Sequence, residues 1–423
     1  MPPDDGPDRP PPAAARAGAP EALAVAPPLP PGGDGDGGGT HARETRLVVV
    51  LGLAAFASSL ATRALDPLLV GVARDFAASA ERVALLASAF ALPYAFVQPV
   101  LGPVGDALGK RRVIAACAAV LGLSLLGCAL APSLDALFVA RVLSGAAGGG
   151  VFPLILAAFG DAVPVERRQV ALSRVLACAI GGQIAGGVVG GLLADAAGWR
   201  GVMAICAATA LLAAAVLARE VRRAPDPPAV PVDPPAILRR YREIAADPRA
   251  RVLFGGVAAE GALVFAVFPF LAALLYARGI GDTATAGFAL GAFGVGGVTY
   301  TVLAPVLLRA LGQPGMMRLG GAMAGAALAG IALAPSAAAL VGAMLALGCG
   351  YFMLHNTIQA RVTEVAPGAR GSAVALHAFS FFVGQSLGPV LFGAGLATVG
   401  PDAILFAAAL GTAALGGWMA ARR

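Results

Sequence analysis

From Leu47 onward the sequence is a series of long apolar runs separated by short clusters of charged residues. A helix needs about 20 mostly apolar residues to cross the hydrocarbon core of a bilayer. Only helices and closed barrels satisfy the backbone in lipid, and continuous rather than alternating apolar runs favour helices. We predict twelve spans, at 47–72, 83–104, 112–131, 135–157, 170–194, 201–218, 252–276, 285–308, 317–334, 337–359, 372–395 and 402–420.

The composition argues against a soluble enzyme. Hydrophobic residues make up 58% of the chain and charged residues 13%, whereas soluble domains carry about 25% charged residues. The five cysteines all fall in apolar runs without metal-ligand spacing, so we expect no disulfide framework, metal site or cofactor. The net charge of +6 does not indicate nucleic-acid binding, because the basic residues lie at the ends of the spans. We expect an all-α membrane protein that is not an enzyme.

Polar and proline-rich segments divide the chain into four parts. Residues 1–45 are rich in Pro, Gly and Asp, and we expect a disordered cytoplasmic tail without a secretory signal. Residues 46–218 and residues 252–423 each contain six predicted spans. The Arg- and Pro-rich segment 219–251 is predicted to be a cytoplasmic linker between these two halves.

The distribution of positive charge predicts the orientation. Cytoplasmic loops of membrane proteins carry an excess of Lys and Arg. Most of the 30 Lys and Arg residues fall on the cytoplasmic side if the N-terminus is cytoplasmic, and the reversed topology would place the basic clusters outside. We therefore expect a multi-pass protein of the plasma membrane (the inner membrane of a bacterium) with both termini in the cytoplasm.

The two halves repeat one another at an offset near 203 residues. Asp106-Ala-Leu-Gly109 aligns with Arg309-Ala-Leu-Gly312, and the turn Asp161-Ala-Val-Pro164 aligns with Glu364-Val-Ala-Pro367. Each match lies at the same place in its half. Parallel repeats related by an axis along the membrane normal are typical of one transporter architecture, whose substrate site lies between the halves.

The loop after the second predicted span reads Gly102-Pro-Val-Gly-Asp106-Ala-Leu-Gly109-Lys110-Arg111-Arg112. It resembles the signature loop of the major facilitator superfamily, G-x-L-x-D-R-x-G-R-[RK], except at Val104 and Ala107. The resemblance covers 46–420 and implies twelve helices in two pseudo-symmetric six-helix halves. In the family the Asp is thought to gate transport at the start of the eleventh helix, here near Gly371, where the helix dipole favours a carboxylate. Alternatively, the loop only fixes the topology.

The fourth predicted span contains Arg141-Val-Leu-Ser-Gly145-Ala-Ala-Gly148. This segment resembles the family's R-x-x-Q-G-x-G-A, with Ser144 in place of the Gln. An arginine about 9 Å into a membrane helix is costly and needs a partner or a water-filled cavity. The resemblance assigns Arg141 to proton coupling, and the alternative is a side chain that extends to the outer interface.

The fifth predicted span contains a regular glycine pattern. Its spacing resembles the family's antiporter segment G-x-x-x-G-P-x-x-G-G, with a glycine where the proline is usual. Small residues at this spacing also allow ordinary close packing of membrane helices, so both interpretations stay open. The pattern consists of Gly182, Gly186, Gly187, Gly190 and Gly191.

Charged side chains within the spans are few. Glu260 lies about 12 Å into the seventh predicted span, and its own helix offers no counter-charge. Desolvation favours the protonated form of such a carboxyl, so Glu260 is a candidate proton-binding residue; a structural or lipid-facing role is the alternative. Arg63 and Asp66 are spaced i,i+3 and are predicted to pair, with a proton or substrate role as the alternative.

Other polar residues gather near the inner ends of the tenth and eleventh predicted spans. We expect either that they meet across a cytoplasmic vestibule or that they form hydrogen bonds at the interface. They are His355, Asn356, Gln359 and His377, and Gln98, Gln183 and Gln385 are weaker candidates for a cavity.

The preferred function is secondary active transport, the proton-coupled efflux of a small organic solute or drug, because the sequence resembles the twelve-helix drug–proton antiporters. The alternatives are a proton-coupled importer, a metabolite exporter or uniporter on the same fold, and a membrane sensor that does not transport. Expected partners are a small-molecule substrate, protons and the lipid bilayer, and the chain is expected to be a monomer. Aromatic residues are only 6% of the sequence, which leans toward an apolar or weakly charged solute.

Overall fold

The computed structural model describes residues 37–163, 165–223 and 233–422, and these ranges contain helices and no β-strand. Residues 1–36 of the predicted tail and 224–232 of the predicted linker lie outside the described part. The α-helices are α1 Gly37–Arg63, α2 Leu69–Asp75, α3 Ala80–Leu108, α4 Lys110–Ala129, α5 Leu134–Gly148, α6 Val151–Ala162, α7 Val165–Arg223, α8 Pro234–Ala246, α9 Pro248–Phe265, α10 Leu271–Arg278, α11 Thr283–Ala332, α12 Ala337–Val365, α13 Arg370–Thr398 and α14 Pro401–Ala421. Three short 3₁₀ helices are η1 Asp66–Leu68, η2 Phe268–Phe270 and η3 Pro367–Ala369.

Ten helical segments in the described ranges are long and apolar enough to cross a membrane. Two helices are much longer than one crossing requires: α7 has 59 residues and α11 has 50. Each contains one glycine with a non-helical backbone, Gly198 (φ 64°, ψ 174°) in α7 and Gly312 (φ 60°, ψ 174°) in α11. Glycine reaches positive φ without the steric penalty of a Cβ atom. Each long helix therefore consists of two helical segments joined at a kink.

The internal repeat is visible in the backbone. Gly109 and Gly312, which the sequence alignment pairs, both have positive φ, at 92° and 60°. Gly198 and Gly400 form a second pair, with φ of 64° and 86° and ψ of 174° and 169°. The 3₁₀ helices η1 and η2 also occupy equivalent places, each after the first long apolar helix of its half. The two groups of helices therefore share the places at which their chains bend.

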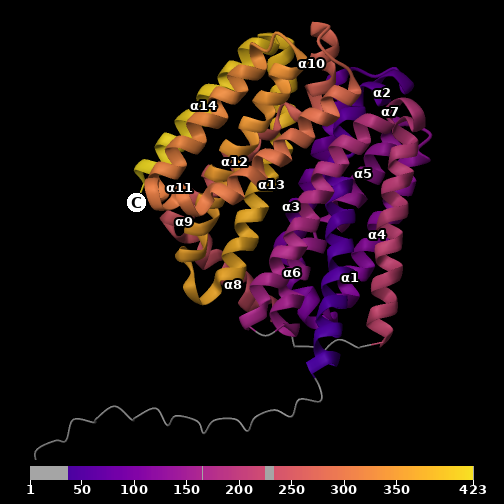
Figure 1. The fold of residues 1–423 in the computed structure, drawn as a ribbon, viewed down its shortest axis with the longest axis vertical. Helices are drawn as coiled ribbons and strands as arrows, with labels where there is room; N and C mark the ends of the chain where they lie inside the picture. Colours follow the sequence, from indigo (N-terminus) through magenta and orange to yellow (C-terminus); the bar gives the residue numbers. More distant parts are fainter. Residues whose placement is uncertain (1–36, 164, 224–232, 423) are drawn as a thin grey trace, which may run out of the picture. The chain divides into compact units, whose positions relative to one another are not determined.

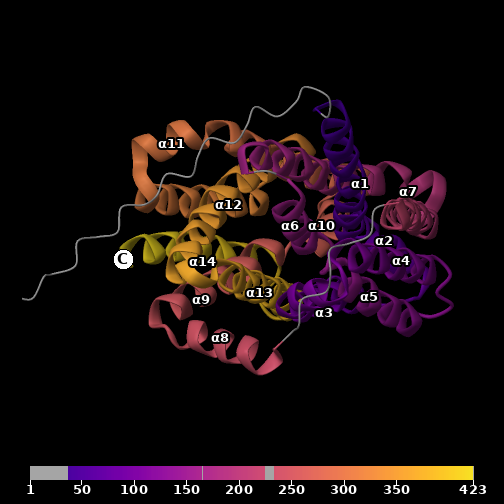
Figure 2. The ribbon, with the colours of Figure 1, turned by 90° about the horizontal axis from the view of Figure 1, so that it is seen from below.

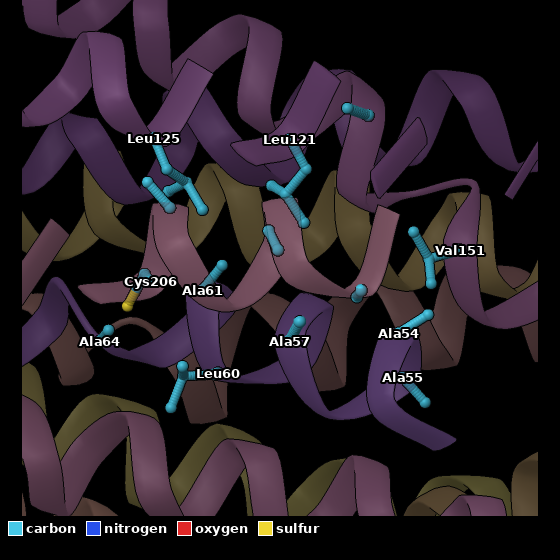
Figure 3. Close-up of a cluster of buried hydrophobic side chains, with 14 of the residues drawn as sticks. Ala54, Ala55, Ala57, Leu60, Ala61, Ala64, Leu121, Leu125, Val151 and Cys206 are labelled. Carbon is cyan, nitrogen blue, oxygen red and sulfur yellow. The ribbon is translucent and has the colours of Figure 1, made fainter. Parts of the chain in front are cut away.

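Buried apolar side chains form two main clusters. One cluster consists of residues between 47 and 217, and the other, apart from Ala84, of residues between 244 and 420. The corresponding helices, α1 to α7 and α9 to α14, occupy opposite sides of the molecule in Figure 1. Figure 3 shows how small residues contribute to the first cluster, where alanines of α1 lie with Leu121 and Leu125 of α4 and Cys206 of α7.

Two pairs of long helices form the largest contacts between the groups. Helix α3 packs against α13, and α7 packs against α11; α3 and α13 lie side by side in Figure 2. At the α3–α13 contact the Ser88 hydroxyl donates to the Ser386 carbonyl at 2.6 Å, and the rings of Tyr94 and Phe382 lie 4.1 Å apart between centroids. This contact borders the site described next.

Candidate functional site

A small pocket lies where the two groups of helices meet, and its volume of about 10 Å³ is enough for about one water molecule. Both groups supply its wall. From α1 and η1 come Thr62, Arg63 and Asp66, from α3 Ala87 and Phe90, from α5 Arg141, from α9 and η2 Phe265, Phe268 and Pro269, and from α13 Gln385 and Pro389. The pocket thus gathers three of the charged residues that the sequence singles out.

Arg63 and Asp66 form an ion pair at this pocket. Arg63 Nη1 lies 3.4 Å from Asp66 Oδ2, and both side chains are largely buried, so the predicted i,i+3 pairing is confirmed. The Arg63 guanidinium also lies over the rings of Phe265 and Phe268, at 4.5 Å and 5.0 Å from their centroids. These contacts join η1 and α1 of one group to α9 and η2 of the other. A substrate or proton role for the pair stays a prediction.

Arg141 is buried more deeply, with 1% of its surface exposed. The close approach of α5 and α3 places it there, because a Cβ atom on Gly145 would lie 2.1 Å from the Phe90 carbonyl oxygen. Arg141 Nε donates to the Leu86 carbonyl at 3.4 Å, and the guanidinium lies 4.4 Å from the centroid of the Phe90 ring. Its Nη1 has no hydrogen-bond partner among the described residues. The side chain stays inside the helix bundle and does not extend toward an interface.

Glu260 on α9 lies in a second buried site. Its side chain is fully buried, and its Oε2 lies 2.8 Å from Nδ1 of His355 on α12. The His355 ring stacks on Tyr351 and lies 5.1 Å from the ring of His377 on α13. Within the described part of the chain, Glu260 Oε1 and His377 Nε2 have no hydrogen-bond partner. Glu260, His355 and His377 are hereafter called the acid–histidine cluster.

The sequence did not predict the pairing of Glu260 with His355. The helix that carries Glu260 offers no counter-charge. The partner, His355, lies 95 residues further along the chain, on another helix. The Asn356 side chain interacts with Tyr300 of α11, and Gln359 is partly exposed. The contacts described therefore bring His355, and not Asn356 or Gln359, to the carboxylate.

Ion pairs within the turn between α3 and α4, and from this turn to α6, hold it in place. Lys110 Nζ lies 2.7 Å from Asp106 Oδ1 and 2.6 Å from Asp161 Oδ2 at the end of α6. Gly109 has φ 92°, a conformation that favours glycine, and it ends α3 and begins the turn into α4. Asp106 is 47% exposed. Its predicted action on the start of α13, near Gly371, stays a prediction.

The glycine pattern of α7 faces two helices. Cβ atoms on Gly182, Gly186 and Gly190 would lie 2.4–2.6 Å from backbone carbonyl oxygens of residues 56–64, in α1 and directly after it. Cβ atoms on Gly187 and Gly191 would lie 2.8 Å from atoms of α11. Gly187, which stands where the family pattern has proline, therefore lies on the face that contacts the other group of helices. The glycine spacing therefore allows α7 to pack closely against both α1 and α11.

Helix α8 is a structured element within the predicted linker. It begins after Asp233, whose side chain accepts a hydrogen bond from the Ala236 amide, and it contacts α9 and α13. The Tyr241 hydroxyl donates to the Pro99 carbonyl of α3 at 2.7 Å. Burial raises the pKa of Tyr241, so the hydroxyl stays a neutral donor. The cap Asp233 followed by Pro234 was the sequence signal that could have predicted this helix.

Residues 51–389 match the family described as Major Facilitator Superfamily. The chain is 26% identical over 370 residues to the MFS-type transporter YfhI of Bacillus subtilis (strain 168), covering 85% of this chain and 89% of that protein. It is 30% identical over 243 residues to the multidrug efflux pump LfrA of Mycolicibacterium smegmatis, covering 56% of this chain and 47% of the pump.

Among solved structures, a point mutant of the nucleoside transporter NupG has a similar fold. The TM-score is 0.75 at 17% sequence identity, with 89% of this chain and all of that chain covered. At this identity the likeness shows the fold alone. The match over most of the chain, with the helical architecture, establishes that the chain belongs to the major facilitator superfamily of membrane transporters and is not an enzyme.

Proposed function

We propose that this chain is a proton-coupled secondary transporter that exports a small organic solute by alternating access. If α7 and α11 each cross the membrane twice, the ten long apolar segments give twelve crossings. In this proposal 46–218 and 252–423 are the two halves, 219–251 is a cytoplasmic linker, and both termini are cytoplasmic. The similarity of part of the chain to a multidrug efflux pump supports export.

The buried pairing of Glu260 with His355 is the observation that supports proton coupling. An ionised carboxylate in the membrane interior needs compensating partners, and one Glu260 oxygen has none among the described residues. A proton on the carboxyl removes that requirement. Uptake of the proton therefore favours an occluded cluster, whereas entry of water favours its release.

Two histidine rings near Glu260 could also accept this proton. Glu260 Oε2 and His355 Nδ1 lie within hydrogen-bond distance, and the His377 ring lies beside the His355 ring. A proton on this cluster neutralises the carboxylate without a fixed counter-ion. A conformational equilibrium responds to a ligand in proportion to its difference in affinity for the two states. Protonation biases alternating access if water reaches the cluster in only one state.

The test is transport by the purified chain in proteoliposomes, with and without an imposed pH gradient. Glu260→Gln is a permanent mimic of the protonated carboxyl, so we expect the response to the gradient to be lost while solute exchange at equal pH continues. Glu364→Gln is the matched control, because Glu364 lies near the end of α12, away from the acid–histidine cluster, and contacts Gln313. A Glu260→Gln protein that still responds to the gradient like the parent would show that coupling takes place elsewhere.

A further inference from the structure

The charged residues of the central pocket do not balance. Two arginines and one aspartate line it. Arginine keeps its charge in proteins, so the two guanidinium groups are positive in every state. Asp66 is already paired with Arg63. The pocket therefore has a net charge of +1 with Asp66 ionised and +2 with Asp66 protonated.

Arg141 forms no close ion pair with any described residue, although Asp66 lies near enough to interact with its charge through space. Its contacts are the Leu86 carbonyl, through Nε at 3.4 Å, and the face of the Phe90 ring. Neither contact neutralises the charge, and Nη1 has no hydrogen-bond partner among the described residues. A buried cation without compensation is unfavourable, so an anion that reaches Nη1 removes an existing penalty. A guanidinium group also presents a planar fork of N–H donors that matches a carboxylate.

The rest of the wall suits an apolar body. Phe90, Phe265 and Phe268 supply aromatic rings, and Pro389 supplies an aliphatic surface. Gln385 also lines the pocket, and its Oε1 has no partner among the residues that the structure describes. A rotated Gln385 amide can present its N–H₂ group to an acceptor on the ligand. The wall thus combines an arginine that has no close ion pair in the described part of the chain, one adjustable amide and several apolar surfaces.

We infer that the solute of this transporter is an organic anion: a small molecule with a carboxylate that binds Arg141 and an apolar body that packs on the pocket phenylalanines. The inference rests on the proposed function, since it names the substrate class of the pocket through which transport is proposed. The pocket has room for about one water molecule in this structure, so the solute binds after alternating access has widened it. It differs from the expectation from composition, an apolar or weakly charged solute. A neutral analogue gains nothing from the Arg141 charge, and a cation meets a pocket that is already positive.

Isothermal titration calorimetry on the purified full-length chain in detergent tests this inference. The probes are matched series on one carbon skeleton, such as benzoate, benzamide and benzylammonium, extended to larger aryl and alkyl carboxylates. We expect each carboxylate that binds to have an affinity about tenfold or more above that of its amide. Hydrogen bonds to charged groups contribute more binding free energy than neutral ones, by an amount that corresponds to this ratio. The amines should not bind.

Variants at the pocket charges should shift this preference in opposite directions. Arg141→Gln should abolish the preference for carboxylate over amide, and Arg141→Lys should keep part of it, because the charge remains but the fork is lost. Asp66→Asn should strengthen carboxylate binding, because it removes the competing negative charge beside Arg63. Arg82→Gln is the control, since Arg82 is exposed and paired with Asp135 at 3.2 Å. The Lys and Asn variants keep the test decisive if Arg141→Gln does not fold.

Three results would overturn the inference: no carboxylate binding across the series, equal or tighter binding of amides or amines, or an unchanged preference in the Arg141 variants. Because calorimetry measures binding without transport, the two proposals fail separately. Carboxylates that bind but are not transported by proteoliposomes would refute the proposed function and leave the anion site intact. Transport of a neutral or cationic solute without carboxylate binding would refute the anion site and leave the proposed function intact.

Discussion

The tight contact between α5 and α3 makes Gly145 a position at which one methyl group has a large effect. A Cβ atom there would lie 2.1 Å from the Phe90 carbonyl oxygen, whereas an ordinary carbon–oxygen contact is about 3.3 Å. The helices must therefore move apart by about 1 Å to accept alanine. Overpacking of this kind lowers the free energy of unfolding by about 1–3 kcal/mol, and the higher helix propensity of alanine offsets at most about 1 kcal/mol of this loss. We expect Gly145→Ala to be destabilised by about 1–2 kcal/mol.

Thermal unfolding of the purified chain in detergent, followed by intrinsic fluorescence, measures this effect. Gly342→Ala on α12 is the matched control, because nothing lies within 4 Å of the added Cβ atom, and its melting temperature should equal or exceed that of the parent. Gly348→Ala should behave like Gly145→Ala, since its Cβ atom would lie 2.0 Å from the Phe293 carbonyl oxygen in the equivalent contact. Equal melting temperatures for Gly145→Ala and Gly342→Ala would refute the reasoning.

Three further predictions concern the loop after α3, helix α8 and the topology. Asp106→Asn should leave folding almost unchanged, because an exposed ion pair contributes at most about 1 kcal/mol, but it should lower the transport rate in proteoliposomes; normal transport would reduce the loop to a signal for topology. Tyr241→Phe should lose one hydrogen bond to Pro99, about 1 kcal/mol, and increase proteolysis at α8; parent-like protection would show that the bond does not hold the helix. Single cysteines in a Cys-free background should be labelled from the cytoplasm in the linker 219–251 and from outside near Asp282, and the opposite labelling would overturn the topology.

Local sequence patterns predict the local part of the site. The i,i+3 spacing of Arg63 and Asp66 is enough to predict their pairing, because both residues lie within one helical turn of each other. The apolar runs likewise predict membrane-spanning helices, because lipid allows few other structures. The gaps expected between spans near Gly198 and Gly312 coincide with the non-helical glycines that divide α7 and α11.

The non-local part of the site could not be predicted in the same way. Glu260 meets His355 only because α9 and α12 pack together, and no periodicity within either helix records that packing. The pattern in α7 shows that glycines are needed, but not that Gly187 faces α11 while Gly186 faces α1. That Arg141 Nη1 finds no hydrogen-bond partner among the described residues is also a property of three-dimensional packing. These features depend on which helix faces are brought together.

In the proposed function, proton movement drives solute export through the pocket between the two groups of helices. The most direct measurement is solute uptake into everted membrane vesicles, energised to be acidic inside, that contain the parent chain or Glu260→Gln. The proposed function predicts accumulation by the parent that collapses when an ionophore dissipates the pH gradient, and no gradient-dependent accumulation by the variant. Accumulation that is insensitive to the ionophore, or equal in the two proteins, would contradict it.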